Sequence, residues 1–175
     1  DAPVRGLHWL LAASVVTAWI SGHWPPAAFD LVHHGAGYVA GAVVLLRLLW
    51  GFAGGRYARF TQFVRAPRET LGYARQWLAR REPRHVGHNP LGAWMVLTLM
   101  IVVSAATISG MLYVGDWLWG YAWLETLHAV FAWLLMVLVL AHLIGVFAAS
   151  KRHGENLVGA MFSGKKRAPV EGDID

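Results

Sequence analysis

The sequence contains no cysteine. This absence excludes disulfides, iron–sulfur clusters, thiolate zinc sites and the covalent attachment of c-type haem through a Cys-x-x-Cys-His motif. Charged residues are also scarce, at 14% of the 175 residues against 57% hydrophobic residues, whereas about a quarter of the residues in soluble proteins are charged. The composition therefore predicts a membrane protein, in which any metal or cofactor is held by histidine or carboxylate side chains.

Four hydrophobic runs are long enough to cross a membrane, since about 20 helical residues span roughly 30 Å of hydrocarbon. They cover residues 7–24, 31–53, 91–114 and 124–149. A further segment at about 67–82 begins with proline and has apolar residues at helical spacing, so we expect a short amphipathic helix on the membrane surface. The polar segment 164–175 is expected to be a flexible tail. The predicted fold is an all-α integral membrane four-helix bundle in one domain, with this interfacial helix.

Lysine and arginine are missing from two connections between the predicted spans. Residues 23–30 and 115–123 contain neither, and the fifteen basic residues all lie near the ends of the chain, at the end of the second span or in the 56–84 loop. The positive-inside rule therefore predicts a multi-pass protein of a bacterial inner membrane with both termini in the cytoplasm. The same charges explain the pI near 10 as topogenic and lipid-facing, so the bilayer is the expected partner and nucleic acid is not.

Four of the nine histidines lie in the hydrophobic runs at two matching depths. His128 and His142 are fourteen residues apart, so they share a helical face within about 40° and lie about 21 Å apart along the axis. His8 enters the first span level with His142, and His33 begins the second span level with His128. Each pair can bind the iron of one haem b, with the two haems held between helices. Two axial histidines leave no open position on the iron, which favours outer-sphere transfer of single electrons.

The outer ligand on the second span can be His33 or His34. We choose His33 because Gly37 and Gly41 follow on the same helical face and leave space for a porphyrin. His34 is the alternative ligand, or a hydrogen-bond donor to a haem propionate.

Cationic side chains at the inner interface are the expected partners of the inner haem's propionates. Arg47 and Arg5 are the candidates. His85 and His88 have a metal-like spacing, but they lie in a loop without carboxylate neighbours, and we expect no non-haem metal site. A haem-free bundle whose histidines relay protons is the alternative outside redox chemistry.

Several motifs follow one another from Arg5 to Arg167. They are Arg5-Gly-Leu-His8-Trp9, His33-x-x-x-Gly37-Tyr38, Arg47-Leu-Leu-Trp50-Gly51, Tyr57-Ala-Arg59-Phe60, Gly87-His88-Asn89-Pro90, Glu125-x-x-His128, His142-x-x-Gly145-Val146 and Arg152-His-x-Glu155-Asn156-Leu157. In these motifs the chain resembles the bacterial di-haem cytochrome b family, which includes b-type cytochrome subunits of Ni/Fe-hydrogenases and prokaryotic cytochrome b561 proteins. The resemblance implies a four-helix bundle with two b haems on His8, His33, His128 and His142. It also implies electron exchange between the membrane quinone pool and a redox partner.

The resemblance leaves three functions open. The first is electron transfer between quinone or quinol and a partner such as a periplasmic c-type cytochrome; the candidate quinone contacts are His88, Asn89, Glu155 and Asn156. The second is a membrane anchor subunit of a larger oxidoreductase such as Ni/Fe hydrogenase. The third is a superoxide oxidase that passes electrons to quinone, although the outer connections lack basic residues to attract an anion. Whether the chain is an enzyme or an electron carrier stays open at this point.

Overall fold

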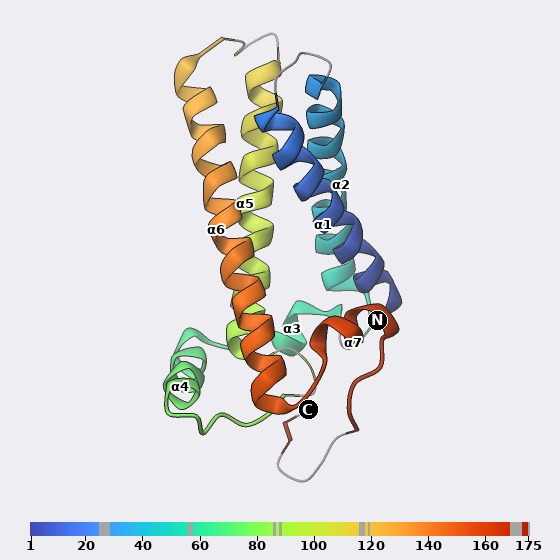
Figure 1. Cartoon of the computed structure of the whole chain (residues 1–175), viewed down its shortest axis with the longest axis vertical. Coiled ribbons are helices and arrows are strands. Elements are labelled where there is room, and N and C mark those ends of the chain that lie inside the picture. Colours follow the sequence, from blue (N-terminus) through green and yellow to red (C-terminus); the bar gives the residue numbers. More distant parts are fainter. Residues whose placement is uncertain are drawn as a thin grey trace.

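The computed structural model describes residues 1–24, 29–55, 58–85, 87, 89–115, 118, 120–168 and 173–174. Helices are the only regular elements among these residues. Four are long, and they stand side by side, while three short ones gather at the end that also holds both chain termini (Figure 1). In chain order the helices are α1 (Ala2–His23), α2 (Asp30–Ala53), α3 (Phe60–Phe63), α4 (Pro67–Leu78), α5 (Pro90–Val114), α6 (Ala122–His153) and α7 (Leu157–Ser163).

The four long helices coincide with the four predicted spans, and each is long and apolar enough to cross a membrane. Proline stands in the first turn of α1 and α5, where its missing N–H costs nothing. Asn89 adds a side-chain cap to α5 by accepting a 2.7 Å hydrogen bond from the Gly92 amide. The 32 residues of α6 extend over about 48 Å, so its last turns project beyond the hydrocarbon. It ends at Gly154, whose φ of 59° lies in the left-handed region that favours glycine.

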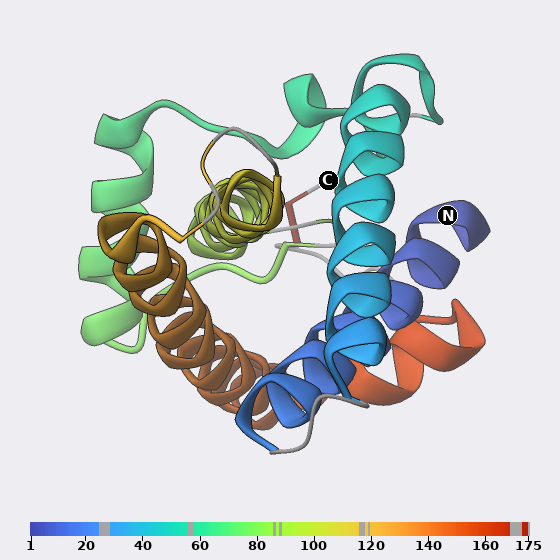
Figure 2. The ribbon, with the colours of Figure 1, turned by 90° about the horizontal axis from the view of Figure 1, so that it is seen from above.

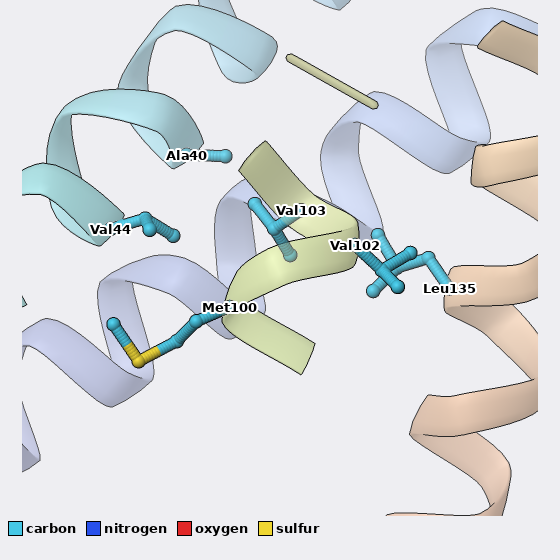
Figure 3. Close-up of a cluster of buried hydrophobic side chains, with 6 residues drawn as sticks. All are labelled: Ala40, Val44, Met100, Val102, Val103 and Leu135. Carbon is cyan, nitrogen blue, oxygen red and sulfur yellow. The ribbon is translucent and has the colours of Figure 1, made fainter. Parts of the chain in front are cut away.

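The four long helices are arranged around a common axis (Figure 2). α1 packs against α2, α5 packs against both α2 and α6, and neither α1 nor α2 packs extensively against α6. The buried apolar core is small and lies where α2, α5 and α6 meet (Figure 3). Its buried members are Ala40, Val44, Met100, Val102, Val103 and Leu135.

Most large apolar side chains of the long helices point away from this core. Leu31 is 81% exposed, Ile101 68% and Val137 62%. In water, each exposed apolar side chain forgoes about 1.5–3 kcal/mol of burial free energy, whereas lipid tails solvate such side chains. This outward-facing apolar surface is that of a multi-pass membrane protein, and it confirms the predicted membrane bundle.

The end of the molecule with the short helices differs from the expectation in three respects. The amphipathic helix α4 stops at Leu78 instead of continuing to about 82, and Arg80 follows with a positive φ of 56°. The short helices α3 and α7 were not predicted. In the segment expected to be a loose tail, Asp173 pairs with Arg84, and the Ile174 amide donates to the Arg84 carbonyl at 2.8 Å. The flexibility of this segment stays a prediction, but these two residues have defined contacts.

Candidate functional site: two histidine pairs

The outer histidine pair consists of His33 on α2 and His128 on α6, whose ring centres lie 5.9 Å apart. Each ring is held by a backbone carbonyl of a neighbouring helix. His33 Nδ1 lies 2.8 Å from the Ala18 oxygen of α1, and His128 Nδ1 lies 2.9 Å from the Ala106 oxygen of α5. Because a carbonyl can only accept, Nδ1 carries the proton in both rings and donates it. The other nitrogen, Nε2, therefore keeps its lone pair for a metal.

Two glycines let these rings lie directly against a helix backbone. A Cβ atom at Gly22 would lie 2.8 Å from His33 Nδ1, and one at Gly110 would lie 3.0 Å from His128 Cε1. Any larger residue at either position would push the imidazole away. Sequence reasoning missed both glycines because each serves a histidine on a different helix. The only available signal was their depth, since each stands at the outer end of its span, as the outer histidines do.

The structure brings His33, and not His34, next to His128. His34 packs edge-on against His33 at 5.9 Å between ring centres. The expectation for the two glycines below His33 is half correct. Gly37 has no heavy atom within 4 Å of a Cβ position, so space exists there, whereas a Cβ at Gly41 would lie 2.7 Å from Thr107 Cγ2. Gly41 therefore serves the close packing of α2 on α5, and the clearance predicted there is wrong.

The inner histidine pair consists of His8 on α1 and His142 on α6, with ring centres 6.4 Å apart and planes at 52°. His8 Nδ1 is buried and has no hydrogen-bond partner among the described residues. The edge of the Trp9 indole meets the His8 ring at 5.2 Å between centres, with planes at 87°.

In both pairs the two imidazole rings have the spacing that is needed to bind one metal ion between them. Imidazole nitrogens bind metals at about 2 Å, so two rings on opposite sides of one ion have their centres about 6 Å apart. Each pair also joins α6 to a helix that does not pack extensively against it, and a flat cofactor needs such separation. Within the described part of the chain, no three His, Cys, Asp or Glu side chains group around a metal position. The histidine pairs therefore fit a haem, whose porphyrin supplies the remaining ligands.

Two arginines toward the inner end of the bundle each have a donor nitrogen without an acceptor. Arg47 is 8% exposed; its Nη2 donates to the Ala58 carbonyl at 3.1 Å, but its Nη1 is buried without a partner among the described residues. Arg5 donates from Nη1 to the Phe162 carbonyl of α7, while its Nε is buried and also has no partner among the described residues. A buried donor without an acceptor costs roughly 1–3 kcal/mol. Anionic groups such as haem propionates would satisfy these donors, so the predicted arginines fit that role.

The residues predicted to contact quinone make other interactions in the structure. Asn156 caps α7 by accepting from the Gly159 amide at 2.7 Å, as Asn89 caps α5. Glu155 forms a buried ion pair with Arg84 at 3.2 Å, and His88 lies outside the described residues. Asn89, Arg84 and Glu155 also line a cavity of about 40 Å³, which is large enough for a water molecule but far smaller than the roughly 300 Å³ of a small-molecule pocket. A second, more open hollow of about 480 Å³ is lined by Glu155 and Asn156.

Comparison with known proteins finds relatives that are named as b-type cytochrome subunits. The chain is 26% identical to the "Probable Ni/Fe-hydrogenase B-type cytochrome subunit" of Bradyrhizobium diazoefficiens, over 95% of this chain and 84% of the relative. It is 30% identical to the "Probable Ni/Fe-hydrogenase 1 B-type cytochrome subunit" of Escherichia coli, over 62% of this chain and 59% of that relative. No solved structure matches the chain. The family model described as prokaryotic cytochrome b561 matches residues 1–164, and with the membrane-spanning helices and their facing histidines this match identifies the chain as a member of that family of membrane b-type cytochromes.

Proposed function

We propose that this chain is a transmembrane di-haem cytochrome that transfers electrons between the membrane quinone pool and a redox partner. In this proposal His8 and His142 hold the iron of the inner haem b, and His33 and His128 hold that of the outer haem b. The observation that carries it is the pair of facing imidazoles at each of two depths, 6.4 Å and 5.9 Å apart between ring centres. One histidine pair at a single depth would need only one cofactor, whereas pairs at two depths of α6 call for two.

The chain's own residues would fix how the cofactors are held. The Ala18 and Ala106 carbonyls orient the outer imidazoles through Nδ1, and this bond raises the basicity of the coordinating nitrogen. Arg47 and Arg5 would neutralise propionates of the inner haem, since both lie toward the inner end of the bundle and have a buried nitrogen without a partner among the described residues. When bound, a six-coordinate haem supplies reversible one-electron chemistry without an open position for a substrate.

The orientation in the membrane follows from charge. Among the described residues, the basic ones outside the spans belong to segments at the end with the short helices, which also holds both termini (Figure 1). We propose that this end faces the cytoplasm of a bacterial inner membrane. The outer connections then face the periplasm and bear only acidic charged residues, of which Asp116 lies outside the described residues. A basic c-type cytochrome is the diffusible partner that this charge favours.

A second candidate function is the membrane subunit of a larger oxidoreductase. It is favoured by the relatives, whose names describe subunits of Ni/Fe hydrogenases. Both functions use the same two haems and differ in the partner. Affinity purification of the tagged chain from its native membranes, followed by mass spectrometry, separates them, because a subunit brings stoichiometric amounts of a catalytic chain. Oxidation of superoxide is a third candidate, and the lack of basic residues in the outer connections argues against it.

Haem quantification tests the cofactor assignment. We expect a dithionite-reduced spectrum of the purified chain to have b-type bands, and a pyridine haemochromogen assay to give about two haems per chain. Alanine variants of the four paired histidines should each lose haem. His34→Ala is their matched control, because it removes the imidazole next to His33 but leaves both pairs intact. One haem per chain, or two haems that survive the loss of a pair member, would reject the ligand assignment.

A further inference from the structure

Trp9 has a buried polar atom that the proposed function leaves unexplained. Its indole Nε1 is shielded from solvent and has no hydrogen-bond partner among the described residues. The indole N–H can only donate, so the missing partner is an acceptor. Arg5 Nε, one turn earlier on α1, and Nδ1 of the neighbouring His8 are also buried without partners among the described residues. Arg5 carries a guanidinium charge, so an acceptor shared by Arg5 and Trp9 is favoured if it is anionic.

A single residue of α7 positions the donors on this side. The Phe162 ring stacks on the Trp9 indole, with ring centres 4.2 Å apart and planes at 21°. The Phe162 carbonyl accepts the hydrogen bond from Arg5 Nη1. The indole also touches the His8 imidazole, so its position relative to the inner ligand is defined. α7 thus holds Arg5 and Trp9, which flank His8 in sequence, against the inner end of the bundle.

We propose that Trp9 binds a propionate of the inner haem through Nε1–H, and that Phe162 is the positioning residue that holds the indole in place. This inference rests on the proposed function, because the carboxylate comes with the haem. It adds a neutral donor to the two arginines, and it gives α7 a role in the cofactor site. The family motif around His8 then contains a propionate donor directly after the iron ligand.

The test uses the full-length chain purified with its haems, and its readouts are the two midpoint potentials and the rate at which each haem is lost to a haem-free globin. Trp9→Phe keeps an aromatic ring for the stack and removes the N–H. Without this donor the propionate's negative charge is less neutralised, which favours ferric iron. At a fixed applied potential, we expect the ferric-to-ferrous ratio of the inner haem to rise about threefold. This corresponds to a fall in its midpoint potential of about 28 mV, since one electron gives 59 mV per tenfold change. Inner haem loss should accelerate severalfold.

Two further variants separate hydrogen bonding from packing. Phe162→Leu keeps the indole N–H but removes the aromatic stack, so the inner potential should shift in the same direction by less. In combination with Trp9→Phe, it should add little, because both changes act on one interaction. Trp133→Phe is the control: this tryptophan contacts Trp19 on the outer side, and its substitution should leave the inner haem unchanged.

The outcomes distinguish this inference from the function on which it rests. A wild-type chain that binds no haem at all refutes the proposed function. A wild-type chain with two haems, and a Trp9→Phe variant with the wild-type inner potential and rate of haem loss, overturns the propionate role alone. A shift of the outer potential in place of the inner one overturns it as well. If Trp9→Phe fails to bind either haem, an unchanged inner potential in Phe162→Leu overturns the proposal, and a lowered one supports it.

Discussion

Replacing Gly22 with alanine is expected to weaken binding of the outer haem and to leave binding of the inner haem unchanged. The added Cβ would lie 2.8 Å from His33 Nδ1, whereas ordinary contacts begin at 3.4 Å. The imidazole would have to move by the difference, 3.4 − 2.8 = 0.6 Å, away from Ala18, whose carbonyl accepts its hydrogen bond at 2.8 Å. Loss of such an outer-shell hydrogen bond typically lowers metal affinity by roughly 10- to 100-fold. Gly110→Ala, at 3.0 Å from His128, should have a smaller effect in the same direction.

The assay is haem stoichiometry together with the rate of haem release from the purified variants. Gly145→Ala is the matched control, since a Cβ at that position has no heavy atom within 4 Å. Alanine stabilises a helix by about 1 kcal/mol relative to glycine, so haem loss in Gly22→Ala cannot arise from a weaker helix. Full retention of the outer haem in both Gly22→Ala and Gly110→Ala, or equal loss in the Gly145→Ala control, would refute the reasoning.

Three further predictions concern the pairs, the outer surface and the inner ion pair. Alanine at either member of the inner histidine pair should remove the inner haem alone, and at either member of the outer pair the outer haem alone; spectra in which the losses do not sort in this way contradict the pairing. Reduction of a basic c-type cytochrome by the quinol-reduced protein should slow a few-fold between about 0.1 M and 1 M salt, as the Debye length falls from about 10 Å to 3 Å. Neutralising Asp30, Asp116 and Glu125 should flatten that dependence, and a rate indifferent to both salt and these changes argues against docking at the outer face. Arg84→Met should destabilise the fold by about 3–5 kcal/mol, because the buried Glu155 carboxylate loses its ion pair and keeps the hydrogen bond from the Arg167 amide; thermal unfolding measures this, and adding Glu155→Leu should restore much of the loss.

The sequence was sufficient for the features that repeat along one helix. The spans follow from hydrophobic length, whereas the choice of His33 as a ligand stays a prediction, argued from the residues four and eight positions beyond it. The second of these two arguments used Gly41 for the wrong reason, because a glycine on a helix face clears space equally well for a cofactor and for a neighbouring helix. Thr107 of α5 occupies that space, and nothing in α2 alone indicates it.

Features that depend on two helices could not be predicted in this way. Gly22 and Gly110 serve rings from other helices, and the bond from His33 to Ala18 joins residues fifteen positions apart. Short helices were missed for a related reason. α7 has only seven residues, too few to be stable alone, and its contacts with Trp9 and Arg5 supply the stability that its sequence lacks.

The use of α6 by both histidine pairs restricts how this chain can change in length. One residue inserted or deleted between His128 and His142 would rotate one histidine by about 100° relative to the other and shift it by about 1.5 Å. To restore both alignments, α1 or α2 would have to move around α6 and give up its present packing against its neighbours. An insertion of four residues, just over one turn, is the shortest that keeps both imidazoles on one face, because the resulting spacing of 18 residues is about five full turns. Relatives with longer helices should therefore differ from this chain outside the 128–142 interval, and an engineered version that spaces its cofactors further apart can lengthen α6 by four residues.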